Sequence, residues 1–352
     1  MRCNDLYAAC EGCFLKFWRC DKLNGIDKPF LSYKEQIARL NEKGISCNKA
    51  NEKKYLIRKG YFNLINGYKK PFVISKKENG DHVYLPGTSL EKIYKVLKFD
   101  RRLSGMLLRN ITHVEEEVRT ISGYKFDLLC NKNKTDWTQI ISYDDRADEK
   151  LKLRLIRRIK SEIDLAKDNN NDYINHYTSK YEEIPTWIMT KIIKFTTLIS
   201  FIQLSKKELR VYICNLYDIE YKQNDNNFGI LIGALNWMRR TRNACAHNER
   251  IIFLKDDSRI VITKYHLLLT TAYKNRLRNK QVIDLIIFLK YFNTKREFNK
   301  LINFFDSELE QIAHVVDSKV FESIRASLGI RNMEHLQILR NKEKSINYLN
   351  LL

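Results

Sequence analysis

Hydrophobic residues recur along most of the chain at three- and four-residue intervals, with charged residues between them. Because residues spaced in this way lie on one face of an α-helix, the pattern predicts a mainly all-α protein. The clearest run lies between Thr88 and about Phe126, where no proline occurs. Its apolar positions are Leu97, Leu103, Leu107, Ile111, Val114, Val118 and Ile121. We expect one long helix here, or two helices joined by a kink.

The remaining sequence predicts several shorter helices. Ser32 and Glu35 form a reciprocal capping arrangement that opens a helix, and Gly44 would end it. The stretch "KDNNNDY" (167–173) is typical of a loop. Further helices are expected over residues 148–167, 185–204, 206–217 and 227–247, with three or four more after about Lys280.

Asn79 and Gly80 lie between two short β-prone runs and give the strongest hairpin signal in the chain. We therefore expect one short β-hairpin near residues 72–85 in an otherwise helical fold. The predicted organisation is a cysteine-rich N-terminal extension (1–27), a helical segment with the hairpin (28–87), a helical core (88–290) and C-terminal helices (291–352).

The charge balance favours a nucleic-acid partner. Sixty-three lysines and arginines against forty-two acidic residues give a formal net charge of +21. A field of this sign attracts polyanions before any contact forms. Arg154, Arg157 and Arg158 lie on one predicted helix and are candidates for binding RNA phosphates.

The sequence gives no signal for secretion or for a membrane span. Its start carries charges and cysteines where a signal peptide has an apolar run. The two most apolar stretches are interrupted by Lys191 and Lys194, and by Asp284 and Lys290. We therefore expect a cytoplasmic protein with reduced thiols and no membrane partner.

Four cysteines near the start raise the question of a metal site. Cys3, Cys10, Cys13 and Cys20 contain a single C-x2-C and could supply four thiolates to zinc. Structural zinc sites more often show two close pairs, or a mixture of cysteine and histidine. The alternative is a partly ordered extension with free thiols. No cofactor is expected.

The stretch "WMRRTRNACAHNERI" (237–251) gathers four arginines, two asparagines and one histidine around a single acid, Glu249. Helical spacing makes Arg242 continue an apolar stripe, while Arg239, Asn243 and His247 form a neighbouring ridge. Arg242 and His247 are then about 140° apart around an ideal helix. The pair therefore fits a two-sided cleft, or else Arg242 caps carbonyls or pairs with a buried acid.

Within this stretch, "RNACAHNER" resembles the R-x4-H signature of HEPN domains, and more closely the corresponding segment of the Abi-like abortive-infection family (the AbiD/AbiF group). Other segments are similar to that family in the same order, from about Lys28 to about Arg331. They are "KPFLSYKEQIARLNEKGI", "YLIRKGYFNLINGYKKPF", "KFDRRLSGMLLRNITHVEEEVRT", "IPTWIMTKIIKFTTLI" and "SIRASLGI".

The resemblance implies a HEPN-like helical bundle and gives several residues a role. Arg242 and His247 match the signature pair, Asn243 the polar residue after the arginine, and Arg250 the distal basic residue. Glu115 and Arg119 match a Glu/Arg pair of the long helix. Arg239 and Arg240 would add to RNA binding.

The chain also departs from the family pattern. Asn248 stands where many relatives have a second histidine, and Thr196 replaces the usual glycine. Lys191 stands where an acid is common, which puts in doubt an acidic partner for the cleft. "RNITH" places Arg109 and His113 four residues apart, a possible second half-site, although one residue short of the signature.

These features lead to two hypotheses. The first is a metal-independent endoribonuclease, a toxin or phage-defence effector that acts as a homodimer and is restrained by an antitoxin. The second is an RNA-binding protein that holds a structured noncoding RNA without cutting it. No compact group of acids suited to two metal ions is present, which disfavours a metal-dependent nuclease. A third possibility, the inactive partner of a nucleotidyltransferase, fits poorly because Glu249 stands where a tyrosine is expected.

Overall fold

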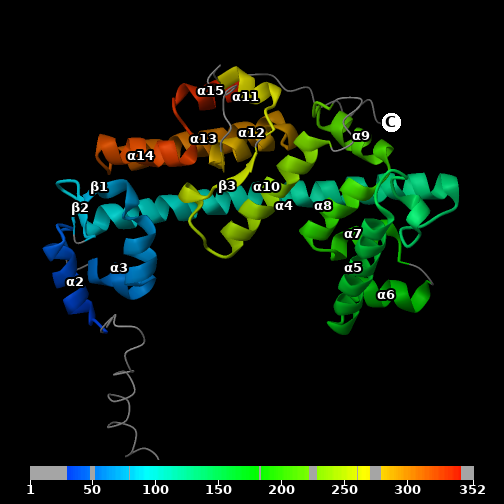
Figure 1. Cartoon of the computed structure of the whole chain (residues 1–352), viewed down its shortest axis with the longest axis horizontal. Coiled ribbons are helices and arrows are strands. Elements are labelled where there is room, and N and C mark those ends of the chain that lie inside the picture. Colours follow the sequence, from blue (N-terminus) through cyan, green and yellow to red (C-terminus); the bar gives the residue numbers. More distant parts are fainter. Residues whose placement is uncertain are drawn as a thin grey trace, which may run out of the picture.

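The computed structural model describes residues 30–47, 52–78, 80–181, 184–221, 228–259, 261–269 and 279–341, and it is mainly helical (Figure 1). Its central element is α4 (Leu90–Asn133), a single helix of 44 residues. The Ser89 side chain accepts a hydrogen bond from the Lys92 backbone and opens this helix. The predicted long helix is therefore confirmed, and it runs past Phe126 without a second segment.

The elements before α4 agree with the sequence predictions. Helix α2 (Tyr33–Glu42) begins with the expected Ser32/Glu35 capping box. It is followed by α3 (Glu52–Lys59), the π-helical turn η1 (Phe62–Asn66) and the 3-10 turn η2 (Lys70–Phe72). Strands β1 (Val73–Lys76) and β2 (His82–Tyr84) then pair antiparallel, so the predicted hairpin is confirmed.

After α4 the chain forms η3 (Ile140–Ser142), α5 (Glu149–Asp168), α6 (Asp172–Lys180), α7 (Thr186–Ile192), α8 (Phe195–Leu204) and α9 (Lys207–Leu216). The predicted loop over 167–173 is wrong in extent, because only three residues separate α5 from α6. The Asn171 side chain accepts from the backbone of Tyr173 and Ile174 and starts α6 at once.

The single helix expected over 185–204 is also wrong, because the chain is extended at Ile193 and Lys194 between α7 and α8. Side chains from elsewhere satisfy the backbone groups that this break exposes. Arg119 donates to the carbonyl of Ile193 at 2.7 Å, and the Lys194 N–H donates to Glu162 at 2.7 Å. Partners so distant in sequence override a helical hydrophobic pattern.

The last third contains α10 (Gly229–Ala246), η4 (Ile251–Phe253), α11 (Lys264–Leu269), α12 (Val282–Phe292), α13 (Lys295–Ala313), α14 (Ser318–Leu328) and α15 (Glu334–Asn341). Between Lys280 and Asn341, where the described residues end, four helices agree with the expected three or four. A second antiparallel pair, β3 (Asp256–Arg259) with β4 (Asn279–Lys280), was not predicted.

Many of the other elements pack on helix α4. It contacts α7, α10, α13, α9 and both turns η1 and η4. In Figure 1, α12 to α15 lie on one side of α4, while α2–α3 and α5–α6 project from its opposite side at the two ends. The carboxyl end of α10 lies between these two projections. Buried residues from Leu40 to Leu339 form one continuous hydrophobic core.

Two sequence expectations, the possible zinc site and the N-terminal extension, concern residues that the structure does not describe. Cys3, Cys10, Cys13 and Cys20 lie outside the described residues, as does the whole extension 1–27.

Among the helices that the structure describes, none is long and apolar enough to span a membrane.

The contact between α4 and α7 depends on a glycine, and a matched pair of substitutions tests it. A Cβ at Gly123 would lie 2.9 Å from the Trp187 Cα, a backbone atom that cannot easily move. We expect Gly123→Ala to lower the free energy of unfolding by about 1–3 kcal/mol. Gly105, in the same helix, has open space around it, and Gly105→Ala should raise that free energy by about 0.5–1 kcal/mol. Denaturant unfolding followed by circular dichroism measures both, and equal effects would refute close packing at Gly123.

Candidate nucleic-acid interface

The R-x4-H arginine lies against a buried acid of the central helix. Where α10 crosses α4, Arg242 Nε is 3.7 Å from Glu115 Oε2, and the Glu115 side chain is 10% exposed. Arg119, one turn further along α4, donates from Nη2 to Glu115 Oε1 at 2.5 Å. The carboxylate therefore lies between two guanidinium groups, as a nearly buried acid requires.

Arg119 extends this network to the break between α7 and α8, because it also donates to the carbonyls of Thr190 and Ile193. Lys191 is exposed, and its Nζ lies 5.8 Å from the centre of the Tyr173 ring. The acidic partner of Arg242 thus comes from α4 rather than from α7. Glu115, itself bound by Arg119, is thus the carboxylate that lies beside Arg242.

Arg242 is not fully occupied by this contact. Its side chain is 40% exposed, and Nη1 makes only a long hydrogen bond, 3.4 Å, to Asn243 Oδ1. His247 follows the last residue of α10 and is exposed. No hydrogen bond or ion pair within the described part of the chain joins Arg242 to the His247 imidazole. Within one chain, the Arg242 guanidinium and the His247 imidazole are therefore not in direct polar contact.

The backbone at the end of α10 suits an asparagine at position 248. The N–H groups of Asn248 and Glu249 donate to the carbonyls of Cys245 and Ala244, which is the hydrogen-bond pattern of a Schellman motif. Asn248 therefore has a positive φ of 56°. Asparagine, aspartate and histidine are the side chains that adopt this region most readily after glycine. The helix consequently ends at His247 and leaves the imidazole in solvent.

A second buried acid fixes the segment that follows. Asp100 on α4 accepts hydrogen bonds from the Tyr68 hydroxyl at 2.7 Å and from the Ile252 N–H at 2.8 Å. Burial raises the pKa of Asp100, while these hydrogen bonds oppose the shift. Because Tyr68 follows η1 and Ile252 lies in η4, Asp100 joins both turns to the central helix.

The distal basic residue, Arg250, lies beside η1. Its Nη1 donates to the carbonyls of Asn66 and Gly67, both at 3.4 Å. Arg101 of α4 donates to Asn248 Oδ1 at 3.4 Å and to the Glu249 carbonyl at 3.3 Å. Arg240 donates to the Lys255 carbonyl at 3.0 Å. These side chains enclose a pocket of about 600 Å³ between η1, α4 and the segment after α10.

The sequence did not indicate all of this pocket. Arg240 and Arg250 were candidates, whereas Arg101, Lys255 and Phe62 were not. Arg101 lies within a helix whose periodicity draws attention to its apolar positions, and no spacing links it to a motif some 150 residues away. Arg239, which was also a candidate for RNA binding, is half-buried on α10 and does not line the pocket.

The other candidate arginines lie elsewhere. Arg154, Arg157 and Arg158 are exposed on α5, and two of them, Arg154 and Arg158, line a small pocket against α8. His113, the possible second half-site, has its Nε2 3.4 Å from Glu117 Oε1 and 3.5 Å from Glu297 Oε1. It therefore connects α4 to α13.

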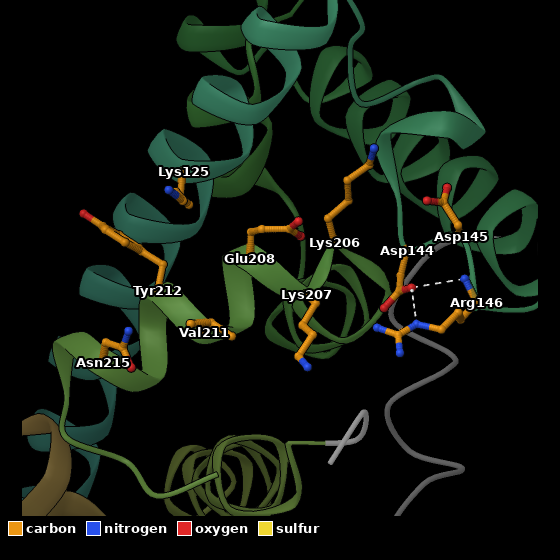
Figure 2. Close-up of a pocket in the computed structure, with 10 residues that line it drawn as sticks. All are labelled: Lys125, Asp144, Asp145, Arg146, Lys206, Lys207, Glu208, Val211, Tyr212 and Asn215. Carbon is orange, nitrogen blue, oxygen red and sulfur yellow. Dashed lines mark hydrogen bonds and ion pairs between the residues drawn. The ribbon is translucent and has the colours of Figure 1, made fainter. Parts of the chain in front are cut away.

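A further pocket, of about 660 Å³, lies between the end of α4, the segment before α5 and α9 (Figure 2). Figure 2 shows its lysines together with Asp144, Asp145 and Glu208. Asp144 is bound by the buried Arg210 at 2.5 Å, and Arg146 lies 3.6 Å from the same carboxylate. Its charges largely offset one another, so it is a weaker candidate for a polyanion.

Comparison with known proteins assigns the chain to a family. A family model described as Abi-like protein matches residues 54–253, more than half of the chain. The chain belongs to the Abi-like family. The match begins in α3 and ends in η4, and so includes Asp100, Glu115 and the R-x4-H segment. No curated protein and no solved structure matched the chain.

The role of Glu115 as the anchor of this Abi-like site can be tested by removing its charge. We expect Glu115→Gln to lower the free energy of unfolding by about 1–3 kcal/mol, because Arg119 and Arg242 would lose their common partner. Glu116 is exposed on the same helix, so Glu116→Gln should change stability by less than about 0.5 kcal/mol. Urea unfolding of both variants decides the matter. If the two are equally stable, Glu115 does not anchor the arginines.

Proposed function

We propose that this Abi-like protein is a metal-independent endoribonuclease that acts in abortive infection. The observation that carries the proposal is the state of Arg242: Nε faces the buried Glu115, while the side chain remains 40% exposed. An arginine positioned in this way offers a rigid pair of donors to a phosphate. His247 lies exposed at the end of the same helix. Membership of the Abi-like family supports the biological setting.

The proposed reaction uses the nucleophile that RNA already carries. The 2′-oxygen attacks the adjacent phosphorus, its proton passes to a base, and the P–O5′ bond breaks as the 5′-oxygen receives a proton. The products are a 2′,3′-cyclic phosphate and a 5′-hydroxyl. Histidine is the side chain best suited to move these protons near neutral pH, so His247 is assigned this role. Arg242 would stabilise the charge on the non-bridging oxygens, Asn243 would orient the ribose or the imidazole, and Arg250 would hold a flanking phosphate.

The divergence of Arg242 and His247 argues for a second copy of the chain. On an ideal helix they are about 140° apart, and five residues separate them by about 7.5 Å along the axis. A two-fold axis would place the same patch opposite itself, so that an arginine of one protomer faces a histidine of the other. A homodimer is therefore part of the proposal.

An alternative is an RNA-binding protein that holds a structured noncoding RNA without cleaving it. The contact of Arg242 with the buried Glu115 favours it, because an arginine beside a buried acid is needed by the fold to avoid leaving that charge unpaired, whether or not the protein cleaves RNA. The net charge of +21 is compatible with either function.

The catalytic assignment predicts the effect of two substitutions. His247→Ala and Arg242→Ala should each lower RNA cleavage about a hundredfold or more, since a positioned proton donor or acceptor contributes on the order of 10² to 10⁴. His314 is also exposed at the end of a helix, α13, so His314→Ala is a matched control with unchanged cleavage. Cleavage of labelled RNA in EDTA measures these rates, and mass spectrometry identifies the ends. A strict need for magnesium, or 3′-hydroxyl ends, would contradict the mechanism.

The dimer predicts complementation between inactive protomers. Mixing Arg242→Ala protein with His247→Ala protein should recover about a quarter to a half of the wild-type activity, because one of the two sites in a mixed dimer would be intact. Each variant alone, at the same total concentration, is the control. A stable monomer with full cleavage activity, shown by sedimentation, would rule out the composite site.

A further inference from the structure

The pocket beside η1 has a composition that suits a nucleotide. It lies between Arg101 on α4 and the segment directly after His247, and its volume is about 600 Å³. Arg240, Arg250 and Lys255 add three further cations, and Glu249 is the acid among the residues that line it. Arg240 is also 4.0 Å from the Asp256 carboxylate, which lies outside the lining. The lining therefore carries a strong excess of positive charge.

Two arginines of the pocket, Arg101 and Arg250, have no carboxylate as a hydrogen-bond partner among the described residues. Arg101 and Arg250 donate only to carbonyl and amide oxygens, at 3.3 to 3.4 Å. Within the described ranges, neither makes an ion pair. Hydrogen bonds of this length to neutral acceptors are weak, so an anionic oxygen can replace them.

Exposed Phe62 gives the same pocket an aromatic surface. It is 74% exposed, although a phenylalanine side chain in a monomer usually loses most of its contact with water. It belongs to the π-helical turn η1, a local distortion found frequently at functional sites. Asn63 and Asn66, exposed on the same turn, offer amide groups that can bond the edge of a base.

We propose that this pocket binds one nucleotide of single-stranded RNA next to the cleavage point. The base stacks on Phe62, and Arg101 with Arg250 holds a phosphate. A single strand is required because a base within a duplex cannot present its face to an aromatic ring. The identification of the ligand as substrate rests on the proposed ribonuclease function.

The position of the pocket along α4 fits this arrangement. Arg101 precedes Glu115 by fourteen residues, which is about 21 Å along a helix axis. The pocket and the Arg242–Glu115 contact are therefore distinct sites on one helix, and His247 belongs to the segment between them. Asn248 and Glu249, which directly follow His247, line the pocket, so a nucleotide bound there lies beside the segment that carries the imidazole.

Binding without cleavage tests the proposal directly. The full chain carrying His247→Ala is titrated against a fluorescent 12-nucleotide RNA without secondary structure, with anisotropy as the signal. Adding Phe62→Ala should raise Kd about tenfold, and Phe62→Tyr should restore it, because the ring is what stacks. Adding Arg101→Gln should raise Kd and also flatten the logarithmic salt dependence by about 0.7.

Matched controls separate the pocket from general surface effects. Phe30 is 79% exposed and lies outside the pocket, and Lys98 is exposed one turn before Arg101 on α4. Phe30→Ala and Lys98→Gln should change Kd less than twofold. The proposal is overturned if Phe62→Ala leaves Kd unchanged, or if it weakens binding of a hairpin duplex as much as that of the single strand.

The two proposals can fail separately. If Phe62→Ala weakens binding but the wild-type chain does not cleave RNA, the pocket is an RNA site and the nuclease assignment is wrong. If the wild-type chain cleaves RNA while Phe62→Ala binds normally, the nuclease stands and the pocket does not hold the substrate.

Discussion

The arrangement of the central helices depends on the burial of one carboxylate, Glu115. An acid removed from water is tolerated only when cations or hydrogen-bond donors lie beside it, and here Arg119 donates a hydrogen bond while Arg242 adds a second cation at 3.7 Å. Arg119 anchors the turn between α7 and α8, and Arg242 belongs to α10. The carboxylate thereby fixes two neighbouring elements relative to α4. The same contact also orients the arginine that the proposed chemistry requires.

Asp100 has a comparable role nearer the start of α4. It holds Tyr68 and Ile252, and so joins η1 and η4 on either side of the proposed nucleotide pocket. The two acids are about four helical turns apart along α4. The interface is thus built on one rigid helix, with each half fixed by a buried acid. A site on such a support keeps its geometry better than one formed by loops alone.

The sequence predicted those features that depend on local pattern. The long helix, the Ser32/Glu35 capping box and the hairpin follow from periodicity and turn chemistry, and the structure confirms all three. The break at Ile193 and Lys194 could not be predicted, because Arg119 and Glu162 satisfy its backbone groups from distant parts of the chain. Arg242 was recognisable from its spacing within α10. Its contact with Glu115 remained one of several alternatives, because Glu115 lies far from it in the sequence. Arg101 and Phe62 required the tertiary structure.

The spacing of the R-x4-H motif has a structural reason in this fold. Five residues carry the chain from the face of α10 that contacts α4 to the point where the Schellman motif ends the helix. The arginine is therefore buried enough to be oriented, and the histidine is exposed enough to meet a ligand. A two-fold dimer would bring two such arginine-rich ends together at a cost in electrostatic repulsion, which a phosphate backbone between them would relieve. RNA binding would then strengthen dimerisation by the same free energy by which dimerisation strengthens RNA binding, because coupled equilibria shift each other equally.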